Sequence, residues 1–296
     1  MTIELLVLMF LKAQAAASGV VLLVLALRLP VRRLLGAELG YILWALVPIA
    51  AMASLFPTLP EFRRQLDAAP DGLALQTLQL PVMHHAIILF QIWLAGAALA
   101  AAVFALGHRR FACKARQGLA GPAITGFWPH MVVPSDYAER FSAEERAFIR
   151  AHERAHMTRQ DLSASLLIAA FQVASWFNPL MHLAAACVRL DQEMACDARV
   201  IAHQPKARRR YAETLLKAHV RGWSSPLACA LALGGKHPLE VRLAMLGVRK
   251  ISVRRDQWGV FAIGLLAVVI AGGLWALTPV WWEMLGSDVL RQRFLG

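Results

Sequence analysis

Four long apolar stretches restrict what this chain can fold into more than any other feature of its sequence. They cover residues 5–27, 39–56, 86–106 and 258–282. A helix needs about 20 mostly apolar residues to cross the hydrocarbon of a bilayer, and a helix satisfies all its own backbone hydrogen bonds there. The chain is also 58% hydrophobic, which is more than an ordinary soluble domain contains. We therefore predict a mainly α-helical, polytopic membrane protein with four transmembrane helices.

The positive charge of the chain follows the loops between these stretches. The net charge is +12, which is compatible either with nucleic-acid binding or with the Lys/Arg excess of cytoplasmic loops. Basic clusters at 28–33 and 108–116 follow the first and third stretches, whereas the loop 57–81 is nearly balanced. We expect contact with membrane lipid and no direct nucleic-acid partner. The charges place both termini outside the cytoplasm, in a multi-pass protein of the bacterial inner (cytoplasmic) membrane.

These features predict four regions along the chain. Residues 1–107 form transmembrane helices 1–3, 108–256 a cytoplasmic domain, 257–282 transmembrane helix 4, and 283–296 a short extracytoplasmic tail. Residues 162–188 are apolar too, but Asn178-Pro179 interrupts them. Basic segments lie on both sides of 162–188, which requires an even number of crossings. We expect helices packed in the domain core or on the membrane surface, and a re-entrant pair also satisfies the charges.

The cytoplasmic domain contains a His-Glu-x-x-His motif at 152–156. Ser142-x-x-Glu145 is a capping box that predicts a helix starting near Ala143. Residues four apart share a helix face, so His152 and His156 can bind one metal ion. A catalytic Zn²⁺ takes three protein ligands and keeps one position open. Glu153 is placed to accept a proton from the attacking water, so the motif predicts a zinc-dependent hydrolase.

A second helical segment, 189–199, supplies carboxylates four residues apart. Glu193 can complete the zinc site, and Asp197 can accept the outer N–H of a ligating histidine. The alternative is an exposed acidic face paired with arginines. His237 and Tyr211 are candidates for stabilising the transition state, and a purely structural role is the alternative for both.

Glycines and prolines divide the segment 118–134, which contains a short β-rich run ending at Pro134. We predict one or two short strands forming a sheet edge. Such an edge could pair with an extended substrate backbone, or it could only pack against the zinc helix.

Taken together, these segments resemble the M56 peptidase family of BlaR1-type integral-membrane metalloproteases. The matching pieces are Pro134, Ser142-x-x-Glu145, HERAH with Arg159 and Asp161 after it, Trp176-Phe177-Asn178-Pro179-Leu180, and Asp191-Gln192-Glu193-Met194-Ala195-Cys196-Asp197. The resemblance implies a cytoplasmic gluzincin-like zinc protease and four membrane spans. It implies zinc ligands His152, His156 and Glu193, with Glu153 as base and Asp197 behind the ligands. The family's sensor-transducers carry an extracellular penicillin-binding domain after the last span, and we expect none here.

The sequence therefore predicts a zinc metalloendopeptidase that cleaves a cytoplasmic, repressor-like regulatory protein, itself, or both, in signal transduction. A sensor protein or a second copy of the chain would be its partner. Two alternatives stay open. One is an M48-like protease for membrane-protein quality control, and the other is a non-catalytic signal transducer that contains zinc.

Overall fold

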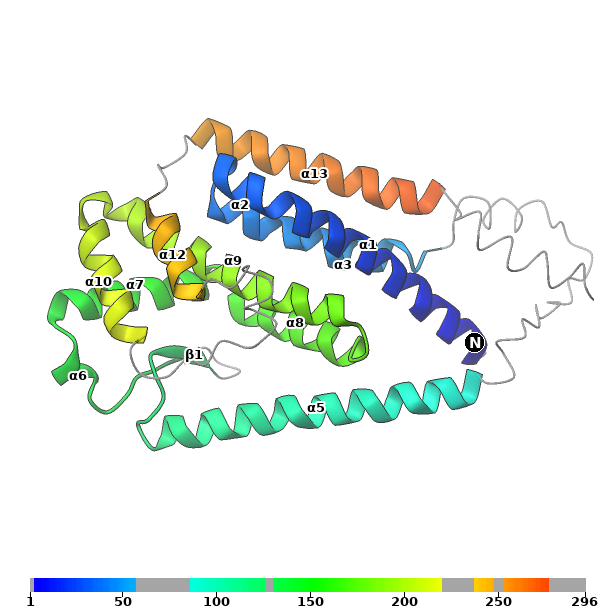
Figure 1. Cartoon of the computed structure of the whole chain (residues 1–296), viewed down its shortest axis with the longest axis horizontal. Coiled ribbons are helices and arrows are strands. Elements are labelled where there is room, and N and C mark those ends of the chain that lie inside the picture. The colour runs from blue at the N-terminus through cyan, green and yellow to red at the C-terminus, as the bar shows by residue number, and fades with distance from the viewer. Residues whose placement is uncertain (1–2, 57–85, 126–129, 220–236, 248–252, 277–296) are drawn as a thin grey trace, which may run out of the picture. The chain divides into compact units, whose positions relative to one another are not determined.

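The computed structural model describes residues 3–56, 86–125, 130–219, 237–247 and 253–276 (Figure 1). The fold is mainly α-helical, as predicted, with one two-stranded sheet. The described elements are α1 (Ile3–Leu35), α2 (Ala37–Ile42), the 3-10 turn η1 (Leu43–Ala45), α3 (Leu46–Ala53), α5 (Ala86–Arg116), β1 (Ala123–Thr125), β2 (His130–Val132), α6 (Tyr137–Arg140), α7 (Ala143–Thr158), α8 (Asp161–Ala174), α9 (Pro179–His203), the 3-10 turn η3 (Pro205–Ala207), α10 (Arg208–His219), α12 (Pro238–Leu246) and α13 (Val253–Ala276).

Three helices of the described part of the chain are long and apolar enough to cross a membrane: Met9–Leu35, Ile87–Arg116 and Asp256–Ala276. They correspond to the first, third and fourth predicted spans. The second predicted span, 39–56, is built differently. It consists of α2, η1 and α3, which together form a shorter apolar helical stretch, Ala37–Ala53. Four spans therefore stay a prediction. The predicted loop 57–81 and the tail 283–296 lie outside the described residues.

The chain forms two compact units, and the three long helices contribute to both. Unit 1 comprises Met1–Val24, Trp44–Ala95 and Val260–Gly296, and unit 2 comprises Leu25–Leu43 and Gly96–Gly259. Unit 2 contains the His-Glu-x-x-His motif. It is larger than the predicted cytoplasmic domain 108–256, because it also includes the end of α1, α2 and part of α5.

Helix α9 is the centre of unit 2. It contacts α2, α7, α8 and α12. The N-terminus of α9 also explains why the apolar stretch 162–188 is interrupted at Asn178-Pro179. Asn178 caps the helix by accepting a hydrogen bond from the Leu180 amide at 3.0 Å. Pro179 occupies the first turn, where its missing N–H costs nothing. The predicted break at Asn178-Pro179 is thus the turn of a helical hairpin made by α8 and α9.

A buried apolar cluster joins the helices that surround the motif. Its buried members are Phe148, Val200, Ile201, Ala207, Tyr211, Leu215 and Leu246. They come from α7, α9, η3, α10 and α12, so one core fixes these elements relative to one another.

The end of α1 is attached to α9 by charge. Asp191 accepts ion pairs from Arg28 at 3.3 Å and Arg32 at 3.2 Å, and all three side chains are buried. The basic segment that the sequence assigned to a solvated loop is therefore partly internal. This contact is one reason why residues 25–43 belong to unit 2.

The short predicted strands are present. β1 and β2 pair antiparallel, with Ala123 opposite Val132 and Thr125 opposite His130. β1 contacts α7, the helix that carries the motif.

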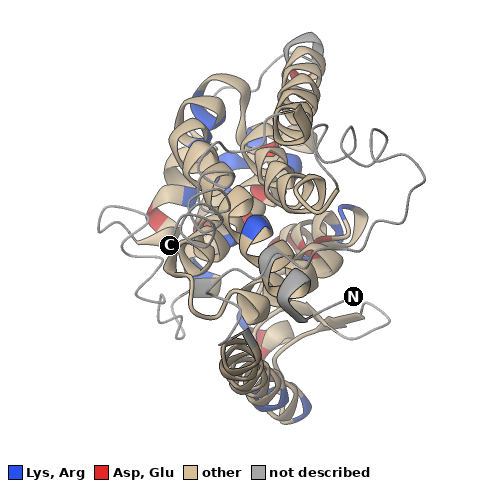
Figure 2. Ribbon diagram, turned by 90° about the vertical axis from the view of Figure 1, so that its right-hand side faces the viewer, with Lys and Arg blue, Asp and Glu red and all other residues tan. Residues whose placement is uncertain are grey.

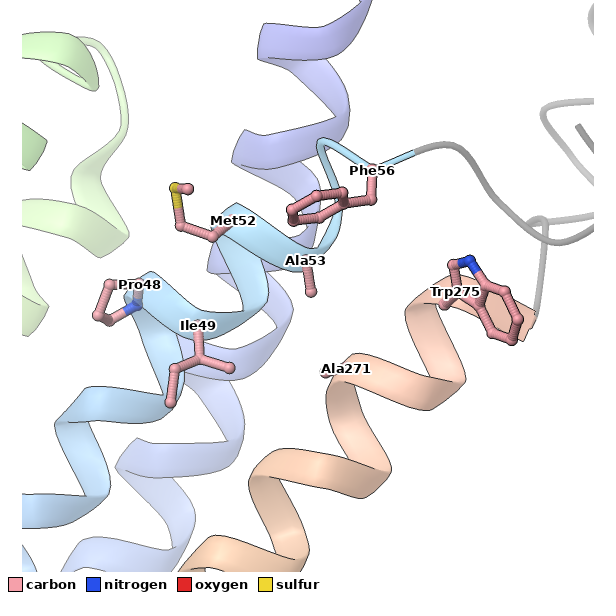
Figure 3. A pocket seen from close by; sticks show the side chains of 7 residues that line it. All are labelled: Pro48, Ile49, Met52, Ala53, Phe56, Ala271 and Trp275. Atoms are coloured by element: carbon pink, nitrogen blue, oxygen red, sulfur yellow. The ribbon is translucent and has the colours of Figure 1, made fainter. Parts of the chain in front are cut away.

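In unit 1, α3 and α13 line an apolar groove (Figure 3). Its lining residues are Pro48, Ile49, Met52, Ala53, Phe56, Ala271 and Trp275.

The basic residues of α5 lie in the last turns of this helix, beyond its apolar part (Figure 2).

Candidate metal centre

Helix α7 begins as its sequence predicts. The Glu145 amide donates to Ser142 Oγ at 3.2 Å, and the Ser142 amide donates to Glu145 Oε2 at 2.7 Å, which completes the capping box. The helix runs to Thr158 without a break. His152 and His156 therefore lie on one face, with their rings edge to face and their centroids 4.8 Å apart.

Three atoms that can bind a metal ion converge between α7 and α9. His152 Nε2 and His156 Nε2 lie 3.1 Å apart. Glu193 places one carboxylate oxygen 3.3 Å from His152 Nε2 and the other 3.6 Å from His156 Nε2. Ligands bound to zinc at about 2.0–2.1 Å in a tetrahedron are separated by about 3.3–3.4 Å. The donor set and its spacing thus fit Zn²⁺ with a fourth position left over.

The ring of His152 is oriented by Asp197 and Tyr211. His152 Nδ1 lies 3.2 Å from Asp197 Oδ1 and 3.0 Å from the Tyr211 hydroxyl. The Tyr211 hydroxyl itself donates to Asp197 Oδ1 at 2.7 Å. Both contacts favour a proton on Nδ1, which leaves the Nε2 lone pair for a metal. The structure places Asp197 where it was predicted. Tyr211 is on the outer side of His152, so its hydroxyl does not face the converging ligand atoms.

The ring of His156 is oriented by Asp161, a residue to which the sequence assigned no role. Asp161 Oδ2 lies 2.8 Å from His156 Nδ1. The buried Cys196 thiol lies 3.3 Å from both atoms. His156, Asp161 and Cys196 also form a possible ligand group, but that group would use the Nδ1 atom that already faces Asp161. Asp161 is the first residue of α8, three residues after α7 ends at Thr158. This closeness in sequence to the motif is the signal that could have indicated it.

Arg242 is the second functional residue that the sequence interpretation missed. It donates to Asp197 from Nε and Nη2, both at 2.8 Å, and its Nη1 lies 3.0 Å from Glu193. Its side chain is 8% exposed. One guanidinium therefore balances the carboxylates of Glu193 and Asp197. A residue at the start of α12 was selected from the sequence, but it was His237 and not Arg242.

His237 caps α12. Its Nδ1 accepts a hydrogen bond from the Leu239 amide at 3.2 Å, and the side chain is exposed. A role in stabilising the transition state stays a prediction for this residue.

Glu153 is buried beside the three ligands. Burial raises the pKa of its carboxyl, while the nearby His152 and His156 act in the opposite direction. A carboxyl whose pKa is raised toward neutrality is suited to accepting and returning a proton. The position of Glu153 is thus compatible with the base predicted from the motif.

The electrostatics of the site favour a bound cation. Burial works against charge on Glu193, but Arg242 and His152 hold its pKa at about 2. Asp197 is also buried, which works against its charge, but Arg242 holds the pKa of its carboxyl well below the ordinary value. Burial likewise works against charge on His152, but its contacts with Asp197 and Glu193 raise its pKa to about 10. The ionised carboxylates of Glu193 and Asp197 thus stabilise positive charge on the His152 ring, at the place where a cation would bind.

Known proteins share this arrangement of segments. The sequence pattern of the M56 peptidase family, described as BlaR1 peptidase M56, matches residues 8–118 and 95–246. The chain belongs to the M56 peptidase family. The match includes α7, α9 and α12, and thereby every residue of the metal centre. Membership of the M56 family indicates a membrane-bound peptidase. The family match agrees with the resemblance found from the sequence motifs.

A curated relative is the regulatory protein BlaR1 of Bacillus licheniformis. It is 29% identical to this M56 chain over 90 residues, which are 30% of this chain and 15% of the relative. The aligned part is thus a small fraction of that protein's length.

Proposed function

We propose that this M56 chain is a zinc-dependent endopeptidase whose site faces the cytoplasm. The observation that carries the proposal is the convergence of His152, His156 and Glu193 at 3.1–3.6 Å. These residues would hold Zn²⁺. When bound, zinc would lower the pKa of a water molecule and polarise the carbonyl of the scissile peptide bond.

The protein's own groups would do the remaining work. Glu153 would take the proton from the attacking water and deliver it to the departing amine nitrogen. Asp197 and Asp161 would keep both histidine rings in the tautomer that presents Nε2. Arg242 would keep Glu193 and Asp197 ionised at neutral pH.

The sheet beside α7 suggests how a peptide is held. β1 and β2 form a two-stranded sheet, and β1 contacts the zinc helix. An extended substrate segment could add to an edge of this sheet through main-chain hydrogen bonds. We propose a cytoplasmic, repressor-like regulator, the chain itself, or both, as substrate, because the curated relative BlaR1 is a regulatory protein. The signal would reach the protease through a sensor partner or a second copy.

The decisive experiment is Glu153→Gln in the full chain, co-expressed with the candidate regulator. The amide preserves the size of the side chain but cannot accept the proton, so cleavage should fall by at least about 100-fold. Zinc content, measured by atomic emission, should stay near one ion per chain. Glu213→Gln on α10 is the matched control, because Glu213 is exposed and pairs with Arg209 at the surface.

Continued cleavage by the Glu153→Gln form would contradict the catalytic assignment. Loss of zinc in that form would show that Glu153 supports the metal rather than the reaction. Normal signalling without cleavage would favour the non-catalytic transducer.

A further inference from the structure

The hairpin of α8 and α9 touches α5 at its tip. A Cβ atom built on Gly96 of α5 would lie 2.1 Å from Cε2 of the Trp176 indole. Trp176 stands in the turn between α8 and α9. Ala97 is the one buried residue among the side chains described for α5. The tip of the hairpin is thus packed directly on the backbone of α5.

Gly96 lies at the middle of the apolar part of α5. This helix is a candidate membrane span, and its first charged residue is Arg109. The ten residues from Gly96 to Leu106 span about 15 Å at 1.5 Å per residue. This is half of the roughly 30 Å hydrocarbon thickness of a bilayer. The contact between Gly96 and Trp176 is therefore at about the bilayer midplane.

The exposed surface of the hairpin has a similar apolar length. Leu166 is 66% exposed, Leu167 48% and Phe177 46%. Leu166 lies eight residues before Ala174, where α8 ends, so it is about 12 Å along the helix from the tip. The exposed face of α8 becomes polar only on the other side of Leu166, at Ser163. The lengths on α5 and α8 thus place the membrane surface at nearly the same level.

The polar groups within the hairpin are satisfied internally. His182 Nε2 lies 3.0 Å from the Trp176 carbonyl, and its Nδ1 lies 3.2 Å from Gln172 Nε2. Arg189 donates to Gln172 Oε1 at 2.8 Å. This is the arrangement that hydrocarbon surroundings require, because polar groups there must pair with one another. Arg189 lies ten residues after Pro179, again about 15 Å from the tip and thus near the headgroups.

We propose that the α8–α9 hairpin is re-entrant: it enters the bilayer from the side of the metal centre, reaches the midplane beside Gly96, and returns. Leu166, Leu167 and Phe177 contact lipid acyl chains. A re-entrant pair crosses the bilayer zero times in net terms, as the basic segments on both sides demand.

The metal centre then lies close to the membrane surface. Asp161 precedes Leu166 by five residues, or about 7.5 Å of helix. A peptide bond cleaved at this centre would lie within about 10 Å of the headgroups. This last consequence rests on the proposed function, whereas the insertion of the hairpin does not.

Spin labelling of the full chain tests the insertion. The four native cysteines are replaced by alanine, and single labels are placed by Phe177→Cys, Leu166→Cys and, as control, Arg209→Cys at an exposed position of α10. The protein is reconstituted in vesicles of phosphatidylethanolamine and phosphatidylglycerol. Collisions with apolar oxygen and with water-soluble nickel chelate are then compared. Position 177 should favour oxygen strongly, 166 moderately, and 209 should favour nickel.

Two results would overturn the proposal. Nickel access at 177 equal to that at 209 would place the tip in water. Low access to both reagents would place it against protein rather than lipid. A measurement that keeps the native cysteines is photocrosslinking from benzoylphenylalanine at position 177. It should add the mass of one phospholipid, and crosslinks to protein alone would contradict the proposal.

A pair of glycine substitutions tests the contact itself. Gly96→Ala would force the Trp176 ring away, whereas a Cβ on Gly107, in the same helix, meets nothing within 4 Å. The Gly96→Ala change should alter oxygen access at 177 at least two-fold, and Gly107→Ala should leave it unchanged. Equal behaviour of the two would remove the basis of the depth assignment. None of these positions holds metal or substrate, so a lipid-exposed label on an inactive enzyme would refute only the proposed function.

Discussion

At the scale of single residues, the metal centre depends on side chains that do not touch the metal position. Each histidine has its outer nitrogen against a carboxylate, Asp197 for His152 and Asp161 for His156. Arg242 in turn neutralises Asp197 and Glu193. Four helices, α7, α8, α9 and α12, contribute to this network, so the geometry of the three predicted ligands depends on how these helices pack in unit 2.

Asp161→Asn should weaken zinc binding. The amide cannot hold the Nδ1 proton of His156 as a carboxylate does, and loss of such a partner costs about 10–100-fold in metal affinity. Competition with a chromogenic chelator measures the Kd. Asp161 also accepts from Tyr41 at 3.3 Å, so Tyr41→Phe serves as a control that removes a different contact and should change the Kd much less. An unchanged Kd for Asp161→Asn would show that His156 needs no such partner.

Arg242→Gln should destabilise the protein by about 3–5 kcal/mol, because it leaves Asp197 and Glu193 buried without their cation. Urea or thermal unfolding in detergent measures the change, with and without added zinc. Arg209→Gln is the matched control, since that side chain is 92% exposed and should cost less than about 0.5 kcal/mol. Equal stability of the two variants would mean that the buried carboxylates are balanced in another way.

The sequence groups the residues that we predict to be ligands, but not the residues that support them. His152, Glu153 and His156 follow one another in a capped helix, and Glu193 and Asp197 repeat the same spacing, so local periodicity groups them. Arg242 is 45 residues from Asp197 in sequence. Nothing local marks it, and the nearby histidine drew attention instead. Tyr211 was proposed as a stabiliser of the transition state, but the packing of α10 places its hydroxyl against the outer nitrogen of His152.

At the scale of elements, helix ends determine much of the architecture. The box at Ser142 sets the phase of α7, and the cap at Asn178 sets that of α9, so both ligand-bearing helices have defined starts. Both signals are local and could be read from the sequence. The division of 37–53 into α2, η1 and α3 could not, because an apolar stretch of this length also fits one continuous helix.

Ser142→Ala should lower the stability of unit 2 modestly. Loss of an N-cap side chain costs about 1 kcal/mol, which corresponds to a fall of about 2–4 °C in the apparent Tm for a domain of this size. Thermal unfolding in detergent measures it. Ser163→Ala, an exposed serine inside α8, should leave the Tm unchanged. The cap would be unimportant if both variants melted with the parent protein.

At the scale of the whole molecule, the M56 chain combines membrane helices with a charged metal centre. α1 is connected to α9 through Asp191, two residues from the ligand Glu193. Helix α2 is connected to the centre through Tyr41 and Asp161. A displacement at the end of α1 therefore bears on the ligand-bearing helix through buried charges rather than through a flexible loop.

Cys113 reports the orientation of the chain. It is exposed on α5, among the basic residues that the charge pattern places in the cytoplasm. A membrane-impermeant maleimide should label it in inverted vesicles and not in intact spheroplasts. Cys113→Ser identifies the signal, because Cys187 and Cys196 are buried and any label that remains belongs elsewhere. Labelling of Cys113 in intact spheroplasts would reverse the orientation.

The position of Arg242 has a consequence for how the enzyme is made. The predicted zinc ligands occur at 152–193, but their counter-cation comes from α12, and the next helix of the described part of the chain is α13. Domains form while the chain is still emerging from the ribosome, N-terminal parts first. A nascent chain therefore carries its ligands for some 50 residues of synthesis before the guanidinium arrives. Proteolytic competence would be acquired close to the moment when α13 is delivered to the membrane.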